Sequence, residues 1–210
     1  MSSLIFYTQP DLAVVATDTL AVDSNGRPAF YTNKAAYIPT LRMIIAGVGV
    51  AGFSSQWAEH VSSRMLLSGI ENLDCHAQDG LLSLWDDFKN AEAIDPESST
   101  TTVYHIGFSE ETGDVTVFAY RSTNSFMSER LGYGTAVKPD CKIIDGNLME
   151  TIPSMMSEQR RLQESMPIES RIYIGGDIIA IMLTKDECRY FKLGEFPDRE
   201  ANFREMLFNL

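Results

Sequence analysis

The sequence predicts an α+β protein built as a four-layer helix–sheet–sheet–helix sandwich. The expected elements run in the order strands, two helices, strands, helices, strands along 210 residues. Helices that are segregated from strands in this way can cover the outer faces of two packed sheets, which is a stable arrangement of layers. A chain of this length is also expected to form one domain, residues 1–210, with a substantial hydrophobic core.

Short apolar runs in the first quarter of the chain predict strands. Turn signals separate these runs, notably Gln9-Pro10-Asp11 and Asp23-Ser24-Asn25-Gly26. The expected strands cover residues 4–7, 12–17, 29–33 and 43–47. The amino-terminal region is therefore expected to contribute strands to the fold.

Apolar residues at helical spacing predict two helices in the next part of the chain. Trp57, His60 and Val61 fall on one face of a helix over residues 54–67, and a second helix covers 77–90. Because His60 shares the apolar face, it is expected to be a packed core histidine.

The second half of the chain returns to strands, then to helices, then to strands. A polar loop is expected at 95–100 ahead of a hairpin. The further expected elements are strands at 102–108 and 115–120, a strand through Phe126 ending near Leu131, a helix at 154–164 with an alternative start at Asn147 in which Pro153 begins a new helix, strands at 178–183 and 190–191, and a helix at 199–207.

Three polar residues near the amino terminus stand at informative intervals. Ser2 follows Met1, and a residue this small permits removal of the methionine, which would leave Ser2 with a free α-amine. Asp18 closes an apolar run 16 positions after Ser2, and Lys34 lies 32 positions after Ser2. Met43-Ile44-Ile45-Ala46-Gly47 then offers a strand ending in Ala-Gly ahead of a helix.

This order resembles the proteasome β-subunit family of N-terminal-nucleophile hydrolases, including proteasome-related bacterial proteins. In that family a first residue, usually Thr, is followed at the same intervals by an Asp and a Lys. Thr17-Asp18-Thr19 matches the family's Ala-Asp-Ser/Thr context except at Thr17, and Ala46-Gly47 lies one residue closer to the Lys than in the family. The resemblance implies a hydrolase with the catalytic residues Ser2, Asp18, Lys34 and Gly47.

The chemistry of such a group follows from the weakness of a serine hydroxyl as a nucleophile. The hydroxyl needs a base, and the nearest base is the α-amine of Ser2 itself, which titrates near neutral pH when free. A neighbouring Lys34 ammonium lowers the pKa of that amine, and Asp18 holds Lys34 in place. The backbone N–H of Gly47 would receive the developing oxyanion. Ser3 is expected to be a neutral neighbour, so that Ser3→Ala leaves the reaction largely intact.

The chain departs from the family pattern at several supporting positions. Tyr133, in Gly132-Tyr133-Gly134-Thr135, stands where the family has the Ser of Gly-Ser-Gly. Arg171 and Ile174 stand where the family has Asp-x-x-Ser before the pair Gly175-Gly176, and Leu20 replaces a basic residue. Because Ile cannot orient an amine or pass a proton, a catalytically silent subunit remains an alternative to an active peptidase or amidase.

Composition limits the partners that this chain is expected to have. A net charge of −12 argues against nucleic acid or an anionic membrane as the main partner. The longest apolar run, residues 43–53, is too short to span a bilayer, and no secretory signal is evident, so a cytoplasmic protein is expected. The resemblance implies a homo-oligomeric ring and a peptide or protein substrate, and it leaves room for an ATPase unfoldase as a partner.

A third reading is an unrelated hydrolase that uses a histidine. His60, His76 and His105 each lack a nearby Ser or Cys signature, and no G-x-S-x-G elbow occurs. Neither a cofactor nor a metal is expected, because Asp86-Asp87 reads as an exposed helix face with no second ligand cluster. The remaining reactive side chains, which match neither a disulfide framework nor a metal site, are Cys75, Cys141 and Cys188.

Overall fold

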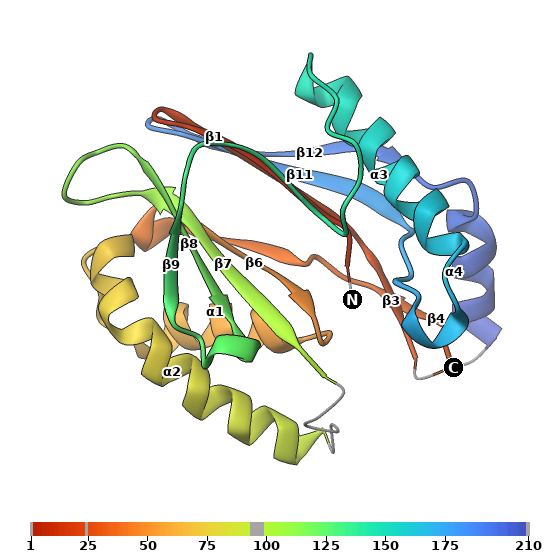
Figure 1. Ribbon diagram of the computed structural model, residues 1–210, viewed down its shortest axis with the longest axis horizontal. Helices are drawn as coiled ribbons and strands as arrows, with labels where there is room; N and C mark the ends of the chain where they lie inside the picture. Colours follow the sequence, from red (N-terminus) through yellow and green to blue (C-terminus); the bar gives the residue numbers. More distant parts are fainter. Residues whose placement is uncertain (1, 24, 93–98, 209–210) are drawn as a thin grey trace.

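The computed structural model describes residues 2–23, 25–92 and 99–208 (Figure 1). Within these residues the chain forms twelve strands and four α-helices, so the protein is a β-rich member of the α+β class. Met1, Ser24 of the predicted turn at 23–26, and most of the predicted polar loop at 95–100 lie outside the described residues.

The first large sheet has five antiparallel strands in the order β10-β1-β2-β11-β12. Their bounds are Gly134–Lys138 for β10, Leu4–Gln9 for β1, Leu12–Asp18 for β2, Asp177–Thr184 for β11 and Cys188–Glu195 for β12. β1 and β2 pair from Leu4 opposite Thr17 to Gln9 opposite Leu12, as a tight hairpin requires. The hairpin places the start of β1 beside the end of β2, and so brings Ser2 to the same end of the sheet as Asp18.

The second large sheet also has five antiparallel strands, in the order β5-β6-β7-β8-β9. Their bounds are Ala35–Ile38 for β5, Met43–Gly49 for β6, Thr101–Phe108 for β7, Val115–Arg121 for β8 and Ser128–Leu131 for β9. The pairing of β5 with β6 ends at Ala35 opposite Ala46, so Gly47 lies just beyond the end of β5. One edge of the last residues of β6 is therefore not paired with β5.

The third sheet is a short ribbon made of β3 (Leu20–Val22) and β4 (Pro28–Tyr31). It begins where the chain leaves the first sheet after Asp18, which is the last residue of β2 paired with β11. The backbone N–H groups of Thr19 and Leu20 donate to the carbonyl oxygen of Gly175. The chain therefore bends out of the first sheet at this point.

The prediction of a four-layer helix–sheet–sheet–helix sandwich is wrong. The described residues contain a third antiparallel sheet that the prediction did not include, and α4 (Arg199–Phe208) packs most closely on β4 of this ribbon. The missing information was tertiary, because β3 is three residues long and its bend depends on hydrogen bonds to Gly175, far along the chain.

The remaining helices pack on the two large sheets, with α1 and α2 on one and α3 on the other (Figure 1). They are α1 (Phe53–Arg64), α2 (Ile70–Ala91) and α3 (Leu148–Glu164), with short 3₁₀ turns at Pro39–Leu41, Ser122–Asn124 and Ile168–Ser170. α2 begins seven residues before the predicted start at 77, and Pro153 lies inside α3 rather than opening a new helix. No helix among the described residues is both long and apolar enough to cross a membrane.

Buried side chains gather in separate clusters that hold these elements together. Trp57 and Leu81 pack with Phe118 where α1 and α2 meet the second large sheet. Phe6 packs with Ile106 between the two large sheets. A further cluster, with Ile5, Met155, Ile178 and Phe196 among its members, joins α3 to the first large sheet. Burial of large apolar side chains, worth about 1.5–3 kcal/mol each, makes these contacts the main source of stability.

Three strands, β3, β5 and β10, and the surroundings of Phe126 and His60 differ from what the sequence predicts. β5 and β10 were not expected, because each is short and lacks a strong apolar pattern. Phe126 lies in a turn before β9 with φ +53°, and its side chain is buried. His60 is partly exposed, while His105 on β7 is the histidine that is buried completely.

Candidate active site

Asp18, the last residue of β2, is completely buried and has hydrogen-bond donors on both carboxylate oxygens. Its Oδ1 accepts from Lys34 Nζ at 2.8 Å and from the backbone N–H of Ser3 at 2.9 Å. Its Oδ2 accepts from the backbone N–H of Gly175 at 3.1 Å. A buried carboxylate is tolerated only when it is paired and hydrogen-bonded in this way, so its orientation is set from three directions.

Lys34 lies between β4 and β5, and only 10% of its side chain is exposed. Besides its ion pair with Asp18, its ammonium donates to the backbone carbonyl of Leu20 at 2.6 Å. An ammonium group has three protons, and these two bonds use two of them. Two fixed acceptors therefore hold a positive charge at one place beside the start of β1.

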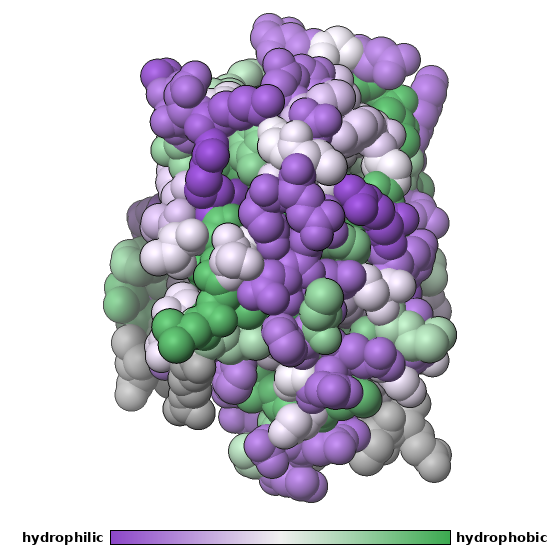
Figure 2. Space-filling model, turned by 90° about the vertical axis from the view of Figure 1, so that its left-hand side faces the viewer, coloured by the Kyte–Doolittle hydropathy of each residue, from purple (hydrophilic) through white to green (hydrophobic). Residues whose placement is uncertain are grey.

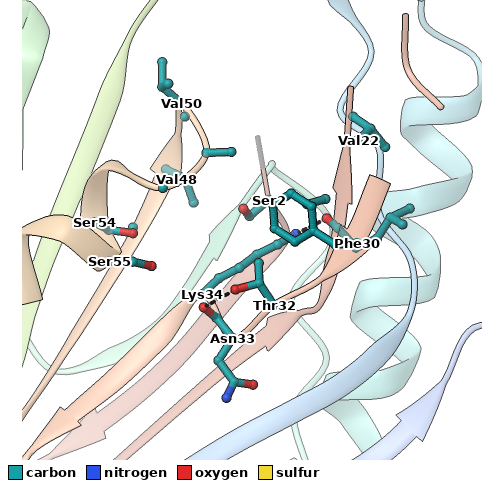
Figure 3. A pocket seen from close by; sticks show the side chains of 16 residues that line it. Ser2, Val22, Phe30, Thr32, Asn33, Lys34, Val48, Val50, Ser54 and Ser55 are labelled. Carbon is teal, nitrogen blue, oxygen red and sulfur yellow. Dashed lines mark hydrogen bonds between the residues drawn. The ribbon is translucent and has the colours of Figure 1, made fainter. Parts of the chain in front are cut away.

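Ser2, Lys34 and Gly47 line one cavity of about 240 Å³ (Figure 3). In this view the side chains of Val48 and Val50 lie on one side of Ser2, and those of Val22 and Phe30 lie on the other. The walls come from β3, β4, the end of β6 and the first turn of α1. The cavity thus joins Ser2 to the Lys34 ammonium and to the edge of β6 that β5 leaves unpaired.

Gly47 is required by the close approach of β6 and α1. A Cβ atom at this position would lie 2.5 Å from the Cβ of Ser54, in the first turn of α1, and 3.1 Å from the carbonyl oxygen of Thr102. Both distances are too short for any side chain to fit without movement of its neighbours. The glycine therefore lets the helix begin against the strand end, which places backbone groups at the cavity wall.

Ser3 and Gln159 belong to the site, although the sequence did not point to either. Both side chains are completely buried, and Ser3 Oγ donates to Gln159 Oε1 at 2.5 Å. These contacts argue against the neutral role expected for Ser3, which only the labelling of Ser3→Ala can test. The signal for Gln159 lies in the spacing of α3, where it continues the buried stripe formed by Ile152, Met155 and Met156.

Three of the positions at which the chain departs from the family pattern do not line this cavity, whereas a fourth, Leu20, does. Tyr133 is 54% exposed, and Ile174 belongs to the buried cluster between α3 and the first sheet. Arg171 donates to the backbone carbonyls of Glu164 and Met166 near the end of α3. Of the described residues that line the cavity, none is one of these three.

His105 is a packing residue on the helix-facing side of the second large sheet. Its Nε2 accepts a hydrogen bond from Trp57 Nε1 at 2.7 Å, and the two rings lie nearly parallel. Complete burial lowers the pKa of His105 to about 3, because the charged form loses its hydration. The ring of His60 also stacks on that of Trp57, with ring centroids 5.5 Å apart.

The cysteines and acidic residues do not form a second reactive centre in the part of the chain that the structure describes. Burial raises the thiol pKa of both Cys141 and Cys188, which disfavours the reactive thiolate. Cys75 is an exposed free thiol on α2. Across residues 2–23, 25–92 and 99–208, no group of three or more His, Cys, Asp or Glu side chains could hold a metal ion.

Neither a scan against protein-family models nor a search of curated proteins finds a match for this chain. What the site can do is therefore inferred from its own residues and their geometry.

Proposed function

We propose that this protein is an N-terminal-nucleophile hydrolase, a peptidase or amidase that uses Ser2 after removal of Met1. The observation that carries the proposal is the buried Asp18–Lys34 pair, whose ammonium lines the same cavity as Ser2 and Gly47. A nearly buried ion pair is costly to maintain, and a perturbed charged pair beside a cavity is a candidate functional site. The spacing of Ser2, Asp18 and Lys34 in the sequence supports the same assignment.

In the proposed reaction, the free α-amine of Ser2 takes the hydroxyl proton as Ser2 Oγ bonds to the carbonyl carbon of an amide substrate. The positive charge of Lys34 favours the neutral, proton-accepting form of the amine, and Asp18 holds Lys34 in position. The carbonyl oxygen becomes an oxyanion, to which the Gly47 N–H would donate. The C–N bond then breaks, and the α-amine returns its proton to the leaving amine. Water hydrolyses the remaining ester and regenerates Ser2.

The cavity favours substrates with an uncharged, apolar group beside the cleaved bond. Leu20, Val22, Phe30 and Val48 supply apolar walls. Among the described residues that line the cavity, the one cationic side chain, Lys34, is already paired. Among the described strands, β3 pairs with β4 alone, so the other edge of β3 has no paired strand. An extended peptide could add hydrogen bonds along such an edge, as peptides do in strand addition.

A second candidate is a catalytically silent subunit with the same fold. The burial of Ile174 in the core favours it, because the resemblance would place a proton-relaying hydroxyl at that position. The two candidates differ in one chemical property, which is whether Ser2 carries a free, reactive α-amine.

The test of the proposed function is covalent labelling of the purified protein after its intact mass has shown that Met1 is absent. A peptide epoxyketone with an apolar side chain is a suitable probe, because it can bond both the hydroxyl and the α-amine of one residue. We expect one probe per chain on Ser2, no labelling of Ser2→Ala, and strong suppression in Lys34→Met, which lacks the ammonium. Ser63→Ala, at an exposed serine of α1, should label like the wild type.

Equal labelling of the wild type and Ser2→Ala would show that Ser2 is not the nucleophile. A processed wild-type protein that does not label would favour the silent subunit. A retained Met1 would exclude the proposed chemistry, because the nitrogen of Ser2 would then be an amide without basicity.

We further propose that the protein acts in the cytoplasm as a homo-oligomeric ring, with an ATPase unfoldase as a candidate partner. Several large apolar side chains on α4 are exposed, among them Phe203, Leu207 and Phe208, and these could pack between subunits. On the face shown in Figure 2, hydrophobic groups are scattered among hydrophilic ones. That face lies on the side of the molecule away from α4, so it is not the surface proposed here as the interface.

Sedimentation velocity at micromolar concentration should report a closed oligomer rather than a 23.4 kDa chain. The double variant Phe203→Ser/Leu207→Ser should weaken the assembly if α4 contributes to the interface. A wild-type protein that sediments as a monomer across this concentration range would refute the ring.

A further inference from the structure

We propose that Gln159 is a positioning residue for Ser2, which acts by holding Ser3 and the end of β10 together. The inference rests on the proposed function of Ser2 and names a residue of α3 that the sequence had not connected with the site. Gln159 does not line the cavity that holds Lys34. Its effect must therefore pass through the residues that it binds.

Ser3 is held from two sides by buried partners. Its backbone N–H donates to Asp18 Oδ1 at 2.9 Å, and its hydroxyl donates to Gln159 Oε1 at 2.5 Å. The two bonds fix both the main chain and the side chain of the residue that directly follows Ser2. Because Ser2 is attached to a residue held in this way, the torsions left to place its hydroxyl and α-amine are few.

The other end of the Gln159 amide binds a different segment. Its Nε2 donates to the backbone carbonyl of Pro139 at 2.5 Å, just after β10. Pro139 lines a second cavity of about 160 Å³, which Ser2 also borders. Gln159 thus ties the start of β1 to a wall of the space on the other side of Ser2.

The identity of the residue at position 159 supports a role beyond packing. Gln159 continues the apolar stripe formed by Ile152, Met155 and Met156, yet it is a completely buried amide; the other buried polar residue of α3, Thr151, is the smaller and retains 9% exposure. Burying an amide costs free energy unless both of its ends are hydrogen-bonded, and a Met could fill the same stripe without that cost. The amide is therefore kept for what it binds.

Positioning of this kind predicts a change in reaction rate without a matching change in binding. The apolar walls that would bind a probe come from β3, β4 and the end of β6. Gln159 is not among the residues that line this cavity. A small displacement of a reacting group can slow a reaction by roughly 10- to 100-fold. The maximal rate of labelling should fall by that factor, while the probe concentration at half-maximal rate stays within about twofold.

The experiment compares the wild type with Gln159→Met, Ser3→Ala and the double variant, using the same peptide epoxyketone. Both single variants should label at least about tenfold more slowly, and the double variant should be no slower than Gln159→Met alone, because both changes break one connection. Gln159→Glu can still accept from Ser3, and when ionised it cannot donate to Pro139, so it should recover only part of the rate. Gln78→Met is the matched control: Gln78 lies on α2 and donates to the backbone carbonyl of Ser125, and neither residue lines either cavity, so its loss should not slow labelling.

Wild-type labelling with an unchanged rate in Gln159→Met and in Ser3→Ala would overturn the inference, even if both variants melted at lower temperature. If Gln159→Met does not fold, Ser3→Ala, which removes one hydroxyl, carries the same expectation alone. If a processed wild type does not label at all, the proposed function fails. Hydrogen exchange of the Ser3 amide proton, measured by NMR, then tests whether Gln159 holds Ser3 in place. Faster exchange in Gln159→Met would support that hold, and unchanged exchange would refute it.

Discussion

Asp18→Ala is expected to lower the free energy of unfolding by roughly 3–5 kcal/mol and to abolish labelling of Ser2. The substitution removes the acceptor for three donors at once: Lys34 Nζ and the backbone N–H groups of Ser3 and Gly175. It leaves the Lys34 ammonium nearly buried without its counter-charge, which is the costly way to break a buried ion pair. Ser2 would then lose both the fixed cation and the hold on the residue that follows it.

Denaturant unfolding and probe labelling together test this expectation. Asp86→Ala is the matched control, because Asp86 forms an ion pair with Lys89 on α2 but is 70% exposed. Exposed pairs contribute at most about 1 kcal/mol, so this variant should unfold and label like the wild type. Comparable stability of the Asp18 and Asp86 variants would contradict the importance that we assign to the buried pair.

The free energy of unfolding is expected to fall as the pH is lowered from about 6.5 towards 3, and His105 is expected to cause part of that fall. The pKa of His105 is lowered to about 3 by burial, against about 6.5 for an unfolded histidine. Between these values the unfolded chain binds a proton that the folded protein does not, so acid favours unfolding. At 1.36 kcal/mol per pH unit, the loss is roughly 2 kcal/mol at pH 5 and roughly 4–5 kcal/mol at pH 3.

The hydrogen bond of His105 also predicts that acid lowers the stability of the fold. Nε2 of His105 accepts the hydrogen bond from Trp57 Nε1, so a proton added there would set two donors against each other. The stability of the wild type should be compared at pH 7.5 and pH 5 with that of His105→Leu/Trp57→Phe, which removes both polar partners. The difference between the two pH values should shrink by about 2 kcal/mol in this double variant.

His76→Gln provides the control for this experiment, because His76 is exposed on α2 and its replacement should leave the pH dependence unchanged. Equal pH dependence in the wild type and in the His105 double variant would show that other groups cause the acid sensitivity. Comparing differences between two pH values, rather than absolute stabilities, removes the loss of packing that both substitutions bring.

The sequence was enough to predict most of the strands and helices, because their signals are local. The hairpin of β1 and β2 follows from two apolar runs around Pro10, and the helical stripe around Trp57 marks α1. The short strands β5 and β10 escaped prediction, since four or five residues carry little periodicity. The start of α2 was missed for a related reason, because its first turn is capped by Glu110, whose carboxylate accepts from the N–H groups of Glu71 and Asn72.

The sequence also selected Ser2, Asp18, Lys34 and Gly47, because their intervals along the chain can be read without a structure. It could not show that Asp18 is completely buried, or that Gly175 completes its hydrogen bonds. These contacts join residues more than 150 positions apart, and only the pairing of β2 with β11 brings them together.

Tertiary structure alone decided the third sheet and the membership of Ser3 and Gln159 in the site. The bend at Thr19 depends on the backbone carbonyl oxygen of Gly175. No local sequence pattern predicts a hydrogen bond to so distant a residue. In the sequence, Gln159 is one of several polar residues on a helix. Tertiary packing buries it in the core beside Ser3. Intervals along a chain determine which residues can be compared with a known chemistry, whereas burial and hydrogen bonding depend on which segments the fold brings into contact.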